Sequence, residues 1–258
     1  MTTAALVSCL KIVSLSDSAL TACKLYRSRL YRRYPIFFAY FVFRVPNGTW
    51  PFLLDIKSPT YQKVWMLTEP LLWAFYILLV FELYRLVLEK YKGLYTVGRW
   101  AMYVGTAVSV AISALSLMVK IRASAPQRSN LFGYFLAAER GIDLSLAIFI
   151  LLILFFLSRY PVALSRNVRL HAILYSIYFL SNTFGLLMRG LFGLRLMDEV
   201  DVLFMGATTG CVIAWLFLLN PAGEQVRDEL PRLGAEHEQR LLIQLDAVNR
   251  ALLKPRGA

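Results

Sequence analysis

The chain has few charged residues and few of the side chains that hold metals or cofactors. Only 17% of its 258 residues are charged, whereas a soluble domain of this length usually carries roughly a quarter. The three cysteines, Cys9, Cys23 and Cys211, are scattered, and no two have the spacing of a metal site or a redox pair. Two histidines are too few for a haem held between helices or for a histidine-rich metal site. We therefore expect no metal and no cofactor.

The motifs of common enzyme classes are also missing. The sequence contains no Walker motif, no HExxH, no GxSxG and no CxxC. The last apolar segment has no lysine, which excludes a retinal Schiff base of the rhodopsin type in that segment. We therefore predict that the protein is not an enzyme.

Long apolar runs dominate the chain instead. The composition is 58% hydrophobic, the mean hydropathy is +0.57, and a helix crosses a bilayer core in about 20 residues. Suitable segments lie at residues 3–22, 35–54, 64–88, 101–119, 131–157, 170–188 and 200–219. We predict an all-α, polytopic transmembrane helical bundle of seven helices over residues 1–220. Six or five crossings are the alternatives, because the first two segments are weaker than the rest.

The weakness of these two segments comes from polar residues and helix breakers. Lys11 and Asp17 interrupt the first segment, so an interfacial helix is the alternative to a crossing. The second segment meets Arg44 and then the tripeptide PNG at 46–48. Proline and glycine at these positions predict a kink or an unwound turn.

The net charge of +12 predicts how the bundle is oriented. By the positive-inside rule, cytoplasmic loops of membrane proteins are enriched in Lys and Arg. The rule explains the positive charge, so we expect no nucleic-acid partner. The segment KLYRSRLYRR (24–33) is strongly basic, and the loops after the third and fifth predicted crossings, near residues 90–99 and 159–169, are also basic. With seven crossings these loops share one side. We predict a multi-pass protein of the bacterial inner membrane with its N-terminus outside and its C-terminus inside. The loop at residues 120–128 is also basic, and this orientation puts it on the outer side.

Residues 221–258 differ from the rest and are predicted to form a cytoplasmic amphipathic tail. Leu241, Leu245, Val248 and Leu252 recur at helical offsets and form one apolar stripe. The stripe either pairs with a helix of a protein partner or folds back against the bundle.

Polar side chains within the apolar segments mark candidate sites, because such groups are costly in lipid and face the bundle interior or a water-filled cavity. The candidate ligand-binding residues are Glu69, Trp73, Tyr76, Glu139, Arg140, Asp143, Tyr178, Asn182 and Arg189. In the sixth segment, Tyr178, Asn182 and Arg189 share a helical face with His171 and Tyr175. The alternative is that this face hydrogen-bonds neighbouring helices and fixes their packing.

Two further patterns predict packing. Glu82, Arg85 and Glu89 are spaced as a self-satisfying ladder of charges along one helix. Gly206 and Gly210 form a GxxxG motif, which lets helices approach closely.

Three stretches give the chain a resemblance to a known group. They are RSRLYRRYP (27–35), TEPLLW (68–73) and ELYRLVLEKYKGLYTVGRW (82–100). In these the chain resembles a group of uncharacterised bacterial seven-helix integral membrane proteins, over most of residues 24–220. The resemblance implies a topology and no activity, ligand or catalytic residue.

Two classes of function remain open. The first is a non-enzymatic sensory or receptor-like membrane protein with an outward-facing polar pocket near Glu69, Glu139 and Arg189. The second is an accessory or structural subunit that docks on a protein partner through its tail or its membrane-embedded faces. A small transporter is a third alternative, but the sequence shows neither inverted repeats nor paired broken helices.

Overall fold

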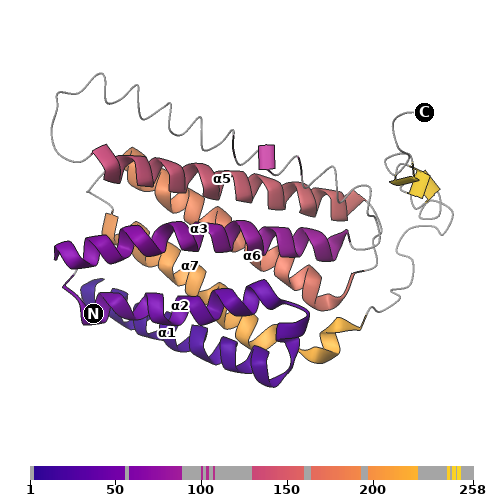
Figure 1. Ribbon diagram of the computed structural model, residues 1–258, viewed down its shortest axis with the longest axis horizontal. Coiled ribbons are helices and arrows are strands. Elements are labelled where there is room, and N and C mark those ends of the chain that lie inside the picture. Colours follow the sequence, from indigo (N-terminus) through magenta and orange to yellow (C-terminus); the bar gives the residue numbers. More distant parts are fainter. Residues whose placement is uncertain are drawn as a thin grey trace. The chain divides into compact units, whose positions relative to one another are not determined.

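The computed structural model describes residues 3–55, 58–88, 130–159, 164–192 and 197–225, with isolated positions in 100–107 and 243–250. Within these residues it contains six α-helices, two short 3-10 helices and no strand (Figure 1). The α-helices are α1 (Thr3–Arg27), α2 (Pro35–Leu53), α3 (Pro59–Val87), α5 (Asn130–Arg159), α6 (Arg166–Phe192) and α7 (Met197–Leu218). The 3-10 helices are η1 (Leu30–Arg32) and η3 (Pro221–Glu224).

The prediction of an all-helical chain is confirmed, and the six α-helices coincide with six of the predicted segments. The fourth predicted segment, 101–119, lies almost wholly outside the described residues, as does the apolar stripe of the tail. The first helix is longer than predicted, since α1 continues through the basic residues to Arg27.

Two of the helices are long and apolar enough to cross a membrane. They are the stretch Leu6–Arg27 of α1 and the whole of α3, Pro59–Val87. Shorter apolar stretches lie at Gly141–Phe155 in α5 and at Val202–Leu218 in α7.

The second helix has no unwound turn at the PNG tripeptide, so of the two predicted outcomes, a kink or an unwound turn, the unwound turn is wrong. The backbone stays α-helical from Pro35 to Leu53, with Pro46 and Pro51 inside the helix. Each proline removes a single backbone N–H. The ladder of hydrogen bonds resumes after them, because the N–H of Leu54 donates to the carbonyl oxygen of Trp50 at 2.9 Å.

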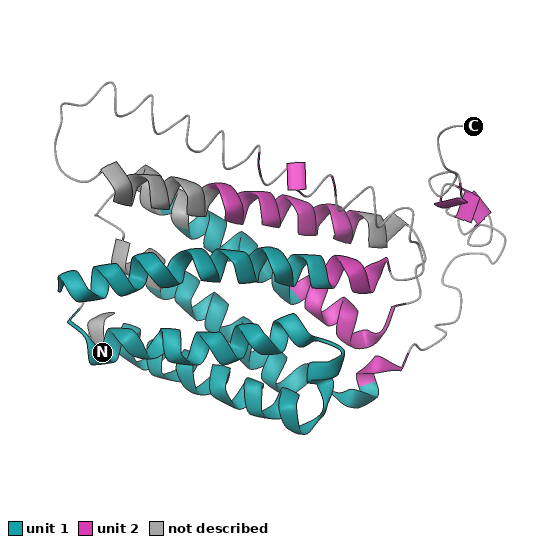
Figure 2. Cartoon of the chain, in the orientation of Figure 1, with its two compact units in different colours: residues 1–82, 174–222 teal, residues 83–173, 223–258 magenta. Residues whose placement is uncertain are grey.

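The chain divides into two compact units (Figure 2). Unit 1 comprises residues 1–82 and 174–222, which include α1, α2, most of α3, the second part of α6 and α7. Unit 2 comprises residues 83–173 and 223–258. In unit 1, α1 packs against both α2 and α7.

An aromatic cluster forms the core of unit 1. Trp215 of α7 is 1% exposed, and its ring centroid lies 5.2 Å from that of Phe37 and 5.1 Å from that of Tyr175. Phe37 also meets Phe41 edge to face at 4.8 Å. Aromatic pairs in such geometry contribute about 0.5–1.5 kcal/mol each beyond their buried area. The cluster therefore holds α2, α6 and α7 together in a fixed register.

A carboxylate from α3 caps the beginning of α2. The residue before the helix, Tyr34, makes no capping hydrogen bond with its side chain, and the first helical residue is Pro35. The buried carboxylate of Glu82 accepts the backbone N–H of Ile36 at 2.9 Å and that of Phe37 at 3.0 Å. The sequence had predicted that this glutamate belongs to a ladder of charges along its own helix. Its carboxylate instead accepts hydrogen bonds from the backbone of α2.

In unit 2, α5 is apolar on two opposite faces. Leu146 and Ile150 are fully buried, whereas Ile148, Leu152 and Phe155 are 50%, 58% and 69% exposed. A helix that is apolar all round suits either a buried core or a membrane. The exposed face of α5 is therefore suited to contact lipid or another protein.

The GxxxG motif of α7 does not bring two described helices together. A Cβ atom added at Gly206 or at Gly210 would meet no atom within 4 Å among the described residues. The predicted close packing through this motif is therefore not found in that part of the chain.

Gly223 in η3 is a position where an added methyl group should be costly. A Cβ atom there would collide with the side-chain oxygen of Asn167, a fully buried residue whose Nδ2 donates to Glu224 Oε1 at 2.5 Å. The amide cannot turn away without breaking that bond. We expect Gly223→Ala to lower the free energy of unfolding by about 2 kcal/mol, measured by denaturation in detergent.

Gly210→Ala is the matched control for this prediction. It adds the same methyl group where space is open, and it replaces a helical glycine, so it should raise stability by about 0.5–1 kcal/mol. Equal stabilities of the two variants would contradict the proposed collision with Asn167.

Candidate functional site

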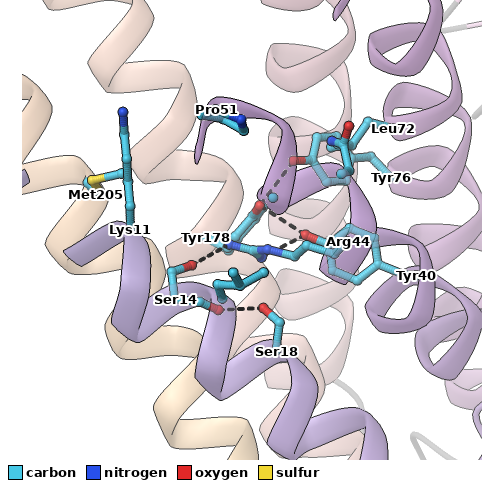
Figure 3. A pocket seen from close by; sticks show the side chains of 13 residues that line it. Lys11, Ser14, Ser18, Tyr40, Arg44, Pro51, Leu72, Tyr76, Tyr178 and Met205 are labelled. Atoms are coloured by element: carbon cyan, nitrogen blue, oxygen red, sulfur yellow. Dashed lines mark hydrogen bonds between the residues drawn. The ribbon is translucent and has the colours of Figure 1, made fainter. Parts of the chain in front are cut away.

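A pocket of about 290 Å³ lies in unit 1, where α1, α2, α3, α6 and α7 contribute side chains (Figure 3). Two cationic residues line it, Lys11 of α1 and Arg44 of α2, and none of the described lining residues is acidic. Asn47 and five hydroxyl-bearing side chains supply the remaining polar groups. The pocket is therefore positively charged and rich in hydrogen-bonding groups.

Arg44 lies at the centre of the polar network in this pocket. Its Nη1 donates to the hydroxyl of Tyr40 at 2.8 Å, and its Nη2 donates to the hydroxyl of Ser14 at 3.1 Å. The guanidinium carbon also lies 5.7 Å from the centroid of the Tyr40 ring. An arginine has five N–H groups, so these two bonds leave donors free to bind a ligand.

Three tyrosines from three helices extend this network. The hydroxyl of Tyr178 hydrogen-bonds to that of Tyr40 at 3.2 Å and to that of Tyr76 at 3.0 Å. All three rings are buried. The chain of hydroxyls therefore links α2, α6 and α3 to the guanidinium of Arg44.

The first helix forms another wall of the pocket. Lys11, Ser14 and Ser18 are separated by three and four residues, so they share one helical face. The hydroxyl of Ser18 donates to the carbonyl oxygen of Ser14 at 2.6 Å. At Gly48 an added Cβ atom would lie 3.1 Å from Leu15 Cδ1. The glycine therefore lets α1 and α2 approach closely enough for Ser14 to reach the arginine.

We expect Tyr178→Phe to lower the free energy of unfolding by roughly 1 kcal/mol. The variant keeps the ring and removes the one hydroxyl that contacts both Tyr40 and Tyr76. Denaturation of the detergent-solubilised protein would measure the change. Tyr26→Phe is the control, because Tyr26 is 66% exposed and should tolerate loss of its hydroxyl. A Tyr178 variant as stable as the wild-type protein would contradict the role assigned to this network.

The structure brings together two of the predicted ligand-binding residues, Tyr76 and Tyr178, which both line the pocket. Glu69 and Trp73 are half-buried on α3, and Asn182 is half-buried on α6. None of these three residues is among the described residues that line the pocket.

The other predicted site residues lie elsewhere or are not described. Asp143 is buried in α5 within unit 2. The side chains of Glu139, Arg140 and Arg189 lie outside the described structure. The outward-facing polar pocket that the sequence predicted near Glu69, Glu139 and Arg189 therefore stays a prediction.

The sequence reasoning missed Lys11 and Arg44 as binding residues. Both were treated only as interruptions of weak apolar segments. The signal was present, because an ionisable residue inside an apolar helix marks a candidate functional site by default. Applying that rule to the first two segments, as was done for the later ones, would have selected both cations.

Among the described residues, no group of three or more His, Cys, Asp and Glu side chains is placed to hold a metal ion. Comparisons of the chain with protein-family models, with curated proteins and with solved structures found no match. The functional argument therefore depends on the pocket itself.

Proposed function

We propose that this chain is a non-enzymatic, receptor-like membrane protein that binds a small anionic ligand in the pocket around Arg44. The observation that carries the proposal is the charge of the pocket. Lys11 and Arg44 both line it, no acidic residue is among its described lining residues, and neither cation forms an ion pair with a described residue. The sequence had suggested an outward-facing polar pocket near other residues, and the charge of the pocket around Arg44 favours an anionic ligand.

The chemistry of the guanidinium group supports a carboxylate or phosphate ligand. Its planar fork of donors matches the oxygens of these groups in pairs. A charge that is withdrawn from water without a counter-ion is costly, and an anionic ligand would offset that cost. The tyrosine and serine hydroxyls could then orient the polar groups of the ligand.

The membrane placement is part of the same proposal. We propose a multi-pass protein of the bacterial inner membrane, with seven helices, the N-terminus outside and the C-terminus inside. The two helices that are long enough to cross a membrane and the exposed apolar face of α5 support this placement. A reporter fused to the C-terminus tests the orientation, and an extracytoplasmic signal would overturn it.

Binding is tested with the full-length chain purified in mild detergent. Thermal unfolding is measured with inorganic phosphate, sulfate and short-chain carboxylates, each against chloride at equal ionic strength. An anion that binds the folded state raises the melting temperature in a saturable way. We expect at least one of these anions to do so and organic ammonium cations to have no effect. The proposal fails if no anion exceeds chloride, or if only the cations stabilise the protein.

An accessory subunit of a larger membrane complex is the second candidate. The exposed apolar face of α5 favours it, because such a face is suited to a partner helix as well as to lipid. Native purification followed by mass spectrometry distinguishes the two. A stoichiometric protein partner would support the subunit, whereas a chain that purifies alone would support the receptor.

A further inference from the structure

A second positively charged surface lies at the other end of α1, around η1. Arg27, Arg29, Arg32 and Arg33 are all exposed. No described acidic residue pairs with Arg27 or Arg29, and Arg32 donates from Nε to the hydroxyl of the adjacent Tyr31 at 3.4 Å. That hydrogen bond raises the pKa of Arg32 above its ordinary value, because it favours the charged form. We call residues 27–33 the arginine turn.

The backbone of the arginine turn is ordered by its own hydrogen bonds. The N–H of Arg29 donates to the carbonyl oxygen of Tyr26 at 3.1 Å, and the N–H of Arg32 donates to that of Arg29 at 3.2 Å. Arg29 itself has φ 57° and ψ 14°, in the left-handed region. Glycine and asparagine occupy this region more readily than other residues. An arginine is therefore held in a conformation that its backbone does not favour.

Three aromatic rings lie beside these arginines, one of them exposed and two half-buried. Tyr26 is 66% exposed and stacks on Tyr31, with ring centroids 5.6 Å apart. The ring centroid of Phe38 lies 5.8 Å from that of Tyr31. Tyrosine is enriched where a membrane protein meets the headgroup layer. Arginines and tyrosines side by side are therefore the composition expected at the headgroup layer.

A shallow depression of about 330 Å³ adjoins the turn and is lined by Cys23, Lys24, Arg27 and Ser28. The ammonium of Lys24 donates to the carbonyl oxygen of Leu216 in the last turn of α7. One lining residue of the depression therefore hydrogen-bonds to a second helix, while another, Arg27, is exposed.

We propose that the arginine turn is a docking site for the headgroups of anionic phospholipids. Arginines near an anionic bilayer surface attract it strongly, and a guanidinium binds phosphate oxygens in pairs. The exposed ring of Tyr26 and the half-buried ring of Tyr31 lie at the same surface, where they would contact the region between headgroups and acyl chains. This site is separate from the Arg44 pocket and does not depend on the ligand proposed there.

The test uses the full-length chain in vesicles with equal amounts of phosphatidylglycerol and phosphatidylcholine. Native mass spectrometry of the released protein measures the ratio of the two lipids that stay bound. We expect the wild-type protein to retain phosphatidylglycerol preferentially, and the preference to weaken with added salt. The triple variant Arg27→Gln, Arg29→Gln, Arg32→Gln should reduce the preference by roughly fivefold for each arginine removed.

The control removes equal charge from exposed positions elsewhere, as Lys63→Gln, Arg85→Gln, Arg166→Gln. It should retain most of the preference. Equal losses in the two triple variants would show that net charge alone attracts the lipid, and the proposal would fail. It would also fail if soluble glycerophosphate displaced the bound lipid, because the turn would then bind free anions.

A single variant separates lipid binding from folding. Arg29→Gly suits the left-handed backbone better than arginine, so the melting temperature should be unchanged or higher. Its preference for phosphatidylglycerol should nevertheless fall roughly fivefold. A purely structural turn predicts the higher stability without the loss of lipid, and that outcome would overturn the proposal.

Discussion

An Arg44→Gln variant is expected to bind the small anion about a hundredfold more weakly than the wild-type protein. The guanidinium offers charged donors to the ligand, and each hydrogen bond to a charged group contributes about 1.5–3 kcal/mol. Loss of two such bonds removes about 3 kcal/mol, which corresponds to roughly a hundredfold in affinity. Isothermal titration calorimetry measures the change in affinity, with the anion that raises the melting temperature most as the ligand.

Two companion variants separate charge from geometry. Arg44→Lys keeps the positive charge but lacks the planar fork of donors, so its affinity should lie between those of the wild-type protein and the glutamine variant. Arg85→Gln removes an exposed arginine of α3 and should leave the affinity unchanged. Binding by Arg44→Gln as tight as that of the wild-type protein would contradict the role of Arg44.

The stability of the ligand-free protein gives an independent readout. Arg44 holds a positive charge partly out of water, and its described contacts are with the hydroxyls of Tyr40 and Ser14. A glutamine keeps one donor group for these hydroxyls and removes the uncompensated charge. The free energy of unfolding of the variant should therefore equal or exceed that of the wild-type protein. Residues kept for binding commonly carry such a cost in stability.

The positions of the helices were largely predictable from the sequence because long apolar runs determine them. The predicted segment 35–54 corresponds to α2, Pro35–Leu53, within one residue. The unwound turn, one of the two outcomes expected inside it, is absent, since local propensity for a turn was outweighed by packing. Phe37 and Phe41 anchor the first half of the helix in the aromatic cluster, and Gly48 packs against Leu15 of α1 in the second half.

The candidate site was only partly predictable, for a reason that concerns helix pairing. Periodicity along one helix shows which residues share a face, and it selected Tyr178 and Tyr76, both of which line the pocket. It does not show which helices are neighbours. The contact between Arg44 of α2 and Ser14 of α1, and that between Tyr40 of α2 and Tyr178 of α6, depend on that pairing.

Glu82 illustrates the same limit and leads to the second large expected effect. Its spacing from Arg85 predicted a ladder on the surface of α3, yet it is 3% exposed and both its oxygens accept backbone N–H groups of α2. A glutamate at this helix N-terminus also interacts favourably with the helix dipole. Glu82→Ala should therefore lower the free energy of unfolding by about 3 kcal/mol, because it leaves two N–H groups without this acceptor.

Chemical denaturation in detergent distinguishes the cap from the ladder. If Glu82 acted mainly through Arg85, Arg85→Ala should be about as destabilising as Glu82→Ala. A capping role predicts instead that Arg85→Ala changes stability by less than about 0.5 kcal/mol, as for most exposed positions. Glu82→Gln should fall between the two, because its single carbonyl oxygen accepts one of the N–H groups while its amide nitrogen cannot accept the other. A glutamine variant as stable as the wild-type protein would mean that neither the charge nor the second oxygen of Glu82 stabilises the beginning of α2.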